Sequence, residues 1–64
     1  MAEHFKEAKA IRETALALLV RLQDGREVWF PKSQIEDESE VFEEDTDGTL
    51  VVSSWFCEKE GIES

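Results

Sequence analysis

Residues 24–35, which read DGREVWFPKSQI, decide the fold of this chain. An Asp-Gly pair between two apolar runs is a strong signal for a β-hairpin, because both residues tolerate the backbone of a tight turn. With this pair at the centre of the turn, strand pairing places Val20 opposite Trp29. It also places Leu19 opposite Phe30. We therefore expect a third strand at about 26–30, paired with the residues that precede the turn.

The first twenty-two residues fit two periodicities. Apolar residues between Phe5 and Leu22 recur about every 3.6 positions, and a high content of Ala, Glu and Lys favours a helix. The stretch 16–22 also carries apolar residues at every second position, which is typical of a strand. A hairpin requires the residues before Asp24 to form a strand, whereas the apolar spacing of the first twenty-two residues, taken alone, favours a helix. In the strand interpretation, a bend at Thr14 separates two strands at about 5–12 and 15–22.

Alternation of apolar and polar residues resumes after the hairpin. Ile35 and Val41 fall on one face of a predicted strand at about 34–42, and the acidic residues between them fall on the other face. Residues 45–48, which read DTDG, form a turn by composition. A fifth strand is then expected at about 49–53.

The end of the chain differs in character from these strands. A serine at position 53 or 54 is suited to cap a short helix at about 55–60. Gly61 suits the left-handed position that ends such a helix, and Ile62 then packs back on Cys57. A helix of this length needs packing against the sheet to be stable.

The composition limits the class of protein. Sixty-four residues, of which 41% are hydrophobic, form one small core, so we take 1–64 as a single domain. The chain holds 16 acidic and 7 basic residues, a net charge of −9. Residues 1–35 carry five acids and six bases, whereas residues 36–64 carry eleven acids and one base. Such an acidic second half argues against direct binding of nucleic acid or of an anionic membrane.

The sequence also predicts a compartment. The longest apolar run, at 15–20, is far shorter than the roughly 20 residues of a membrane span. The polar, acidic start is unlike a secretory signal, and a single cysteine cannot form an internal disulfide. We therefore expect a cytoplasmic protein of the host cell.

Four segments together resemble small proteins of bacteriophages and mobile elements that carry a DG-x-x-V-W-x-P-K-S-Q-I core and an aromatic, Glu-Lys-rich end. The matching segments are residues 12–14, 17–20, 24–35 and 54–62. The resemblance implies a compact antiparallel β domain with a C-terminal helix. It therefore favours a strand over a helix for the residues that precede the Asp-Gly turn. The expected fold is therefore mainly β (α+β), a small antiparallel five-stranded sheet or barrel-like sheet with a short C-terminal helix.

An acidic segment is the most distinctive candidate for a binding site. Half of all the acids lie within twelve positions: Glu36, Asp37, Glu38, Glu40, Glu43, Glu44, Asp45 and Asp47. On one face of a strand, every second carboxylate is spaced by about 6.6 Å, a spacing of the same order as that of backbone phosphates. Trp29 is a candidate interface anchor, because buried aromatic residues dominate binding energy. The simpler interpretation is a solvated face that aids solubility.

Metal binding and catalysis are not expected. Residues 43–48 resemble part of an EF-hand loop, but the twelfth position is Ser54 where a bidentate Glu is needed, so we expect a plain turn. His4 and Cys57 are the only residues of their types and fit no zinc-site spacing. We expect no cofactor, no metal site and no enzyme, since so short a chain has little room for a pocket that tunes paired carboxylates.

These observations lead to two functional hypotheses. The first is an inhibitor of the anti-CRISPR or anti-restriction type, which uses a DNA-mimicking acidic surface to occupy a basic nucleic-acid-binding protein of bacterial defence. The alternative is a structural or accessory protein-interaction module of phage replication or assembly, whose acidity only keeps it in solution. A homodimer is compatible with either hypothesis, because residues 15–20 are apolar on both faces of their strand.

Overall fold

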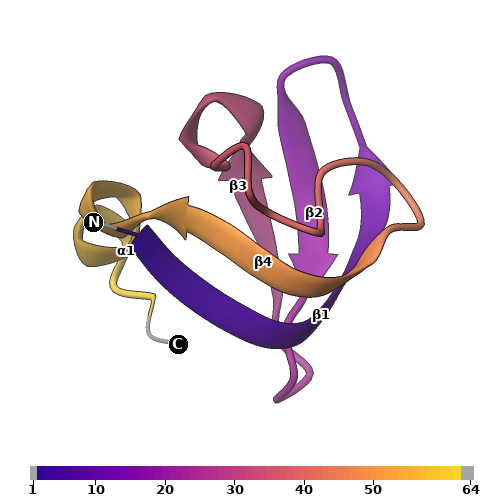
Figure 1. Cartoon of the computed structure of the whole chain (residues 1–64), viewed down its shortest axis with the longest axis horizontal. Helices are drawn as coiled ribbons and strands as arrows, with labels where there is room; N and C mark the ends of the chain where they lie inside the picture. Colours follow the sequence, from indigo (N-terminus) through magenta and orange to yellow (C-terminus); the bar gives the residue numbers. More distant parts are fainter. Residues whose placement is uncertain (1, 63–64) are drawn as a thin grey trace.

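The computed structural model describes residues 2–62 and contains one antiparallel sheet followed by a short helix (Figure 1). The elements in chain order are β1 (Ala2–Glu13), β2 (Ala17–Arg21), β3 (Glu27–Pro31), the 3₁₀ helix η1 (Lys32–Gln34), β4 (Asp47–Ser53) and α1 (Ser54–Glu60). The strand order in the sheet is β3-β2-β1-β4. The predicted mainly β architecture with a C-terminal helix is confirmed, with four strands in place of five.

The long strand β1 is shared between the two halves of the sheet, and Figure 1 shows its strong curvature. Its first half pairs with β4 and its second half with β2. One register shift lies between Phe5 and Ala8, where Glu7 has a φ of 56°, and a second lies between Ala10 and Arg12. Such β-bulges bend a strand and re-aim its side chains. Here they direct Phe5, Ala8 and Ala10 into the core.

The bend predicted at Thr14 is also present. The Thr14 side-chain oxygen accepts a hydrogen bond from the Ala17 N–H (3.0 Å), and the Thr14 N–H donates to the Ala17 carbonyl (2.9 Å). This local closure ends β1 and begins β2, as expected of a threonine that bonds to nearby backbone in a turn.

The hairpin between β2 and β3 forms, but its register differs by one residue from the prediction. Its loop has three residues, 23–25: the Gly25 N–H donates to the Leu22 carbonyl (2.9 Å), and the Leu22 N–H donates to the Arg26 carbonyl (2.7 Å). Gly25 has a φ of 95°, which suits glycine at the end of a three-residue loop. The predicted two-residue loop was wrong, and Leu19 therefore lies opposite Trp29.

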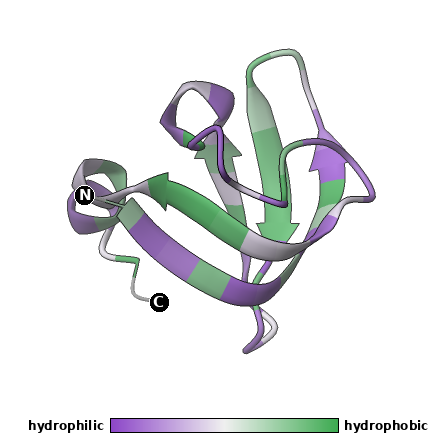
Figure 2. Ribbon diagram, viewed as in Figure 1, coloured by the Kyte–Doolittle hydropathy of each residue, from purple (hydrophilic) through white to green (hydrophobic). Residues whose placement is uncertain are grey.

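The core is built from side chains of all four strands, of α1 and of residues 22 and 41, and Figure 2 shows the hydrophobic stretches along β2 and β4. Phe30 is fully buried at its centre, with its ring centroid 6.0 Å from that of Phe5 and 5.7 Å from that of Phe56. Leu18 lies opposite Phe30 and is equally buried. The one-residue shift of register is therefore what brings two large core side chains together on the same face.

The helix α1 closes one end of the core as predicted. Gly61 has a φ of 70°, its N–H donates to the Glu58 carbonyl (3.4 Å), and the Ile62 N–H donates to the Cys57 carbonyl (2.9 Å). This is the Schellman arrangement that commonly ends helices. Ser53 occupies the N-cap position, although its side chain makes no capping hydrogen bond. Cys57 is buried, and this burial raises the pKa of its thiol, as expected of a packing residue.

The strand predicted at 34–42 is wrong. Residues 32–34 form η1, Ile35 makes a single bridge to Val52, and an irregular loop follows as far as β4. The faces were nevertheless assigned correctly, because Val41 is fully buried and Ile35 packs against the core. Within residues 2–62, no helix is long and apolar enough to cross a membrane.

Candidate functional site

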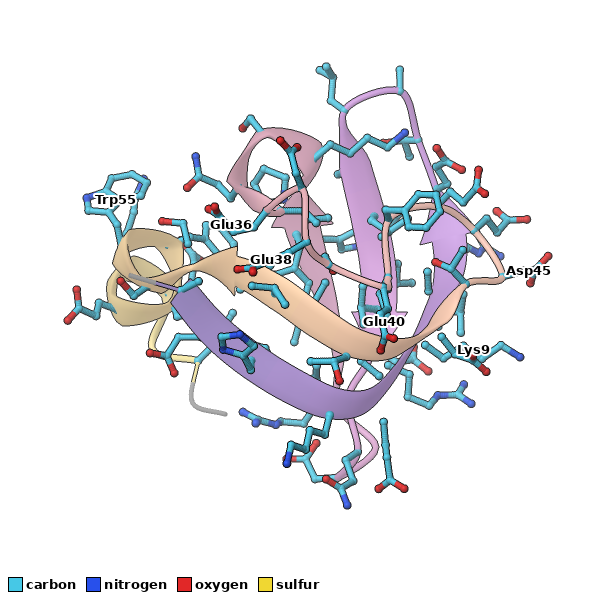
Figure 3. The ribbon with its side chains drawn as sticks, viewed as in Figure 1. Lys9, Glu36, Glu38, Glu40, Asp45 and Trp55 are labelled. Atoms are coloured by element: carbon cyan, nitrogen blue, oxygen red, sulfur yellow. The ribbon has the colours of Figure 1, made fainter. Side chains whose placement is uncertain are left out.

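The candidate site is the acidic loop, which we define as residues 36–47. Eight of its twelve residues are acidic and none is basic. All eight acidic residues predicted for the site are exposed: Glu36, Asp37, Glu38, Glu40, Glu43, Glu44, Asp45 and Asp47. Figure 3 shows Glu36, Glu38, Glu40 and Asp45 spread along the loop from the end of η1 towards the turn before β4. The exposed carboxylates are thus distributed along the whole loop.

The first half of the acidic loop is fixed to β4 through Ser39, whose side chain is buried. The Ser39 hydroxyl donates to the Val41 carbonyl (2.8 Å) and accepts from the Val41 N–H (3.2 Å) and the Val51 N–H (3.0 Å). The Glu36 N–H also donates to the Val51 carbonyl (2.9 Å). One hydroxyl therefore replaces part of a strand ladder, so this edge of β4 is covered without a fifth strand.

Glu40 has a structural role within the acidic loop. Its carboxylate accepts the Thr49 N–H (2.9 Å), and its own N–H donates to the Thr49 carbonyl (3.0 Å). Its side chain lies directly over Gly48. Because residues 34–42 are not a strand, the predicted ladder of Glu36, Glu38 and Glu40 at strand spacing is wrong. Glu40 is hydrogen-bonded to β4, whereas Glu36 and Glu38 are exposed to solvent.

The second half of the acidic loop is fixed to β1. The Thr46 hydroxyl accepts from the Phe42 N–H (3.1 Å) and the Glu43 N–H (3.3 Å), and it donates to the Glu43 carbonyl (2.6 Å). The Asp45 N–H donates to the Ala10 carbonyl (2.9 Å), next to the second bulge of β1. Asp45 has a φ of 70°, a conformation that Asp tolerates better than most residues. The turn therefore lies at residues 43–46, where the Thr46 N–H donates to the Glu43 carbonyl (3.2 Å); the predicted position at 45–48 is wrong, because Asp47 and Gly48 already belong to β4.

A further link joins the acidic loop to the rest of the molecule through Glu13. The Glu13 carboxylate pairs with the Lys32 ammonium group and accepts the Glu44 N–H (3.1 Å). These two hydrogen bonds, the one from Lys32 foremost, hold the pKa of the Glu13 carboxyl below its usual range. Sequence reasoning missed this link because the three residues are far apart along the chain and show no common pattern.

The charge of the acidic loop is not neutralised within the molecule. The ion pairs among residues 2–62 are Arg21–Glu27, Arg26–Asp24 and Lys32–Glu13, and none includes a loop carboxylate. Lys9 lies beside the loop only as the backbone partner of Asp47 across β1 and β4. Like charges concentrated on one surface create a field that attracts cationic partners over about a Debye length, roughly 8 to 10 Å in physiological salt.

Trp29 does not join the acidic loop. It lies on β3, on the face of the sheet opposite to Phe30, with 46% of its surface exposed. β3 is at one end of the strand order, and the loop borders β4 at the other end. The aromatic residue within the loop is instead Phe42, which is 55% exposed. The only signal for it in the sequence is an aromatic residue placed among acids.

The structure offers no metal site in the part of the chain it describes, since no three His, Cys, Asp or Glu side chains of residues 2–62 converge. The chain matches no protein-family model, no curated protein and no solved structure. Its function therefore has to be argued from its own surface chemistry.

Proposed function

We propose that the protein is a non-enzymatic inhibitor, of the kind that bacteriophages and mobile elements carry. In this proposal the acidic loop binds the basic, nucleic-acid-binding surface of a host defence effector, of the anti-CRISPR or anti-restriction type. The observation that supports it is a loop of eight exposed acidic residues, none of which has a basic partner among the described residues. A surface that binds phosphates attracts such a loop for the same electrostatic reason.

The bracing of the acidic loop supports this proposal further. Ser39 and Thr46 fix its backbone by side-chain hydrogen bonds, and Glu13 holds the loop at Glu44. A preformed loop loses less conformational entropy on binding than a flexible acidic tail does. We assign the contacts to the loop carboxylates other than that of Glu40, which is committed to Thr49. The mimicry is therefore one of charge density, without a regular spacing.

The first test identifies the partner and the forces that hold it. The tagged protein is used to capture partners from a bacterial lysate that contains CRISPR and restriction effectors, with washes at low and then high salt. We expect enrichment of a DNA-binding effector that salt or added DNA releases. With that effector purified, the protein should displace fluorescently labelled DNA from it. A captured protein that resists both salt and DNA would contradict the proposal.

A matched pair of variants then tests the surface itself. Asp37→Lys with Glu38→Lys reverses two loop charges, and Glu58→Lys with Glu60→Lys makes the same change in net charge on α1. We expect the loop variant to lose at least about tenfold in affinity, because like charges across an interface are strongly unfavourable. The helix variant should lose much less. Equal losses in the two variants would show that only net charge matters.

A second candidate function is suggested by exposed apolar side chains. Leu16, Trp29, Phe42 and Trp55 are 81%, 46%, 55% and 60% exposed, respectively. Such residues suit an accessory protein-interaction module of phage replication or assembly, with a partner held by apolar contact and little affected by salt. In the same capture experiment, loss of the partner on Trp29→Ala, together with full resistance to salt, would favour this function over inhibition.

A further inference from the structure

One edge of β1 has no strand beside it in the part of the chain that the structure describes. Between Ala2 and Ala8, β1 pairs only with β4, and its pairing with β2 begins at Lys9, opposite Arg21. The bulge at Glu7 marks the point where β1 leaves the course of β2. The edge of residues 4–8 that faces the hairpin loop is therefore open, and an open strand edge is a template for pairing with another chain.

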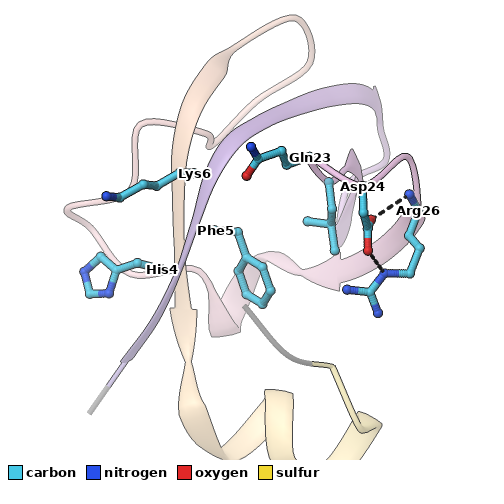
Figure 4. Close-up of a pocket in the computed structure, with 7 residues that line it drawn as sticks. His4, Phe5, Lys6, Gln23, Asp24 and Arg26 are labelled. Atoms are coloured by element: carbon cyan, nitrogen blue, oxygen red, sulfur yellow. Dashed lines mark hydrogen bonds and ion pairs between the residues drawn. The ribbon is translucent and has the colours of Figure 1, made fainter.

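A groove lies between this open edge and the hairpin loop. Its volume is about 360 Å³, and it is lined from β1 by residues 4–6 and from the hairpin by Leu22, Gln23, Asp24 and Arg26. Figure 4 shows the Phe5 ring turned towards the hairpin side. Phe5 and Leu22 are only 5% and 4% exposed, so they form an apolar floor. The groove thus combines an apolar floor with an open backbone edge.

The far wall of the groove is preformed. Asp24 accepts the Arg26 N–H (3.0 Å) with one carboxylate oxygen and the Arg26 Nε–H (2.7 Å) with the other. The hydrogen bond from the backbone N–H of Arg26 is the main reason that the pKa of Asp24 is below its usual range. These contacts brace the hairpin loop, so a ligand does not have to order it.

His4 and Lys6 define the charge of the open edge. Figure 4 shows that both side chains point away from the side on which Phe5 lies, as expected of strand residues on either side of an inward residue. Both are exposed, and neither takes part in an ion pair among the described residues. A strand added at this edge would therefore meet two cationic or protonatable side chains on its outer face and an aromatic ring on its inner face.

We propose that this groove binds an extended segment of a partner protein by β-strand addition to β1, and that the segment reads acidic–apolar–acidic. The central apolar side chain of the segment lies on Phe5 and Leu22. The two flanking carboxylates stand beside His4 and Lys6, because cross-strand neighbours of opposite charge stabilise a sheet. The backbone of the segment pairs with residues 4–8.

This site is distinct from the acidic loop. The loop borders the outer edge of β4, whereas the groove borders the free edge of β1, so the paired strands β1 and β4 lie between them. The inference therefore goes beyond the proposed inhibitor function and does not depend on it. A protein with both sites is able to hold a basic surface and an acidic peptide at the same time.

The test uses the full chain labelled with ¹⁵N and an acetylated, amidated pentapeptide of sequence TEIET as the probe, at about pH 5.5, where histidine side chains carry a positive charge. We expect amide signals of residues 4–8 and 22–26 to shift on titration, and the open-edge amides to gain protection from hydrogen exchange. The neutral peptide TQIQT should bind about fivefold to tenfold more weakly, from the loss of two cross-strand charge pairs. Shifts confined to other residues, or none at millimolar peptide, would overturn the proposal.

Backbone methylation tests strand addition directly. In a strand, successive amides point to opposite sides, so N-methylation of the two Glu residues and of the Ile residue of TEIET blocks alternate edges. We expect one of these two methylated peptides to lose binding and the other to keep it. Equal binding of both would show a purely apolar contact and would overturn strand addition.

Protein variants complete the test with a control on the same strand. His4→Glu with Lys6→Glu should weaken TEIET binding at least about tenfold, because two attractive pairs become repulsive. Lys9→Glu changes a third exposed base of β1, at a position where β2 already covers the edge, and should change binding less than twofold. Equal effects of the two changes would attribute the binding to long-range charge and contradict the assigned site.

Discussion

The hairpin of β2 and β3 and the segment 35–46 share one sequence pattern but differ in structure. In both, apolar residues recur at even spacings, at 18, 20 and 22 ahead of the turn and at 35 and 41 in the segment, as in a strand with one buried face. The hairpin forms a regular ladder of five residue pairs, whereas the segment makes one bridge, at Ile35, and continues as the acidic loop. In both regions the apolar residues at these even spacings face the core, whereas Trp29 and Phe42 are exposed. Alternation thus predicts which side a residue faces, and it does not predict how the backbone is hydrogen-bonded.

The difference lies in what satisfies the backbone. In the hairpin, strand partners supply the donors and acceptors. In the acidic loop, a few backbone hydrogen bonds to β4 and β1 are supplemented by the side chains of Ser39, Glu40 and Thr46, each of which bonds to the backbone of another residue. Polar side chains of this kind compete with strand ladders. A run of exposed carboxylates at strand spacing would also repel along its length, which the irregular path of the loop avoids.

The largest effect is expected at Gly48, where the acidic loop meets β4. Its φ is 130°, and an added Cβ would lie 2.6 Å from the Glu40 carboxylate oxygen and 3.1 Å from the Glu40 Cβ. Relief of this clash requires Glu40 to give up the Thr49 N–H. We expect Gly48→Ala to lower the free energy of unfolding by about 3 kcal/mol, measured by urea denaturation.

Gly25 in the hairpin is the matched control for this substitution. Its φ is 95°, but an added Cβ meets nothing within 4 Å. Gly25→Ala therefore costs backbone strain alone, about 1 kcal/mol. If both substitutions cost the same, Glu40 is not held over Gly48 and the acidic loop is not fixed to β4 as described.

The next effect is expected at Ser39, which stands in for a strand partner. Ser39→Ala leaves the Val51 N–H and the Val41 N–H without the acceptor that they share. An unsatisfied buried donor costs about 1 to 3 kcal/mol, and we expect a total of about 2 kcal/mol in urea denaturation. The control is Ser33→Ala on η1, an exposed position where we expect a change within about 0.5 kcal/mol. A Ser39→Ala protein as stable as its control would show that the loop carries its own backbone pairing.

Much of the fold could be predicted from local signals. The Asp-Gly pair predicts the hairpin, Thr14 predicts the bend, and Gly61 predicts the end of α1. The spacing of apolar residues in β1 favoured a helix, although the segment is a strand, and the reason is physical. A bulge at Glu7 adds one residue between Phe5 and Ala8, so that residues three apart face the same side of a strand. Sequence patterns do not reveal bulges.

The candidate site was predictable in its composition and less so in its geometry. The exposure of the acids follows from their charge. The commitment of Glu40 to Thr49 and the separation of Trp29 from the loop depend on which segments lie side by side in the sheet. The groove beside β1 likewise exists only because two strands part at a bulge. Tertiary neighbours decide these features, and no local pattern encodes them.

The smallest effect on stability is expected at Glu13, which links β1 to η1 and to the acidic loop. Protonation of Glu13 removes the negative charge that pairs with Lys32, and it weakens the hydrogen bonds that the carboxylate accepts from Lys32 and from the Glu44 N–H. Since the folded-state pKa of Glu13 is lowered from an ordinary value of 4.5, its contribution is fully present above that value and is lost as the pH falls through the lower folded pKa. We expect Glu13→Gln to lower the Tm slightly at pH 7, with the difference from the parent shrinking below about pH 4.5.

Lys32→Gln should reduce the pH dependence of the Tm in the same way. The double variant should lose less stability than the sum of the two single losses, because the two residues share one contact. Fully additive losses and an unchanged pH profile would show that this ion pair does not brace the loop, and that Ser39 and Thr46 alone do so.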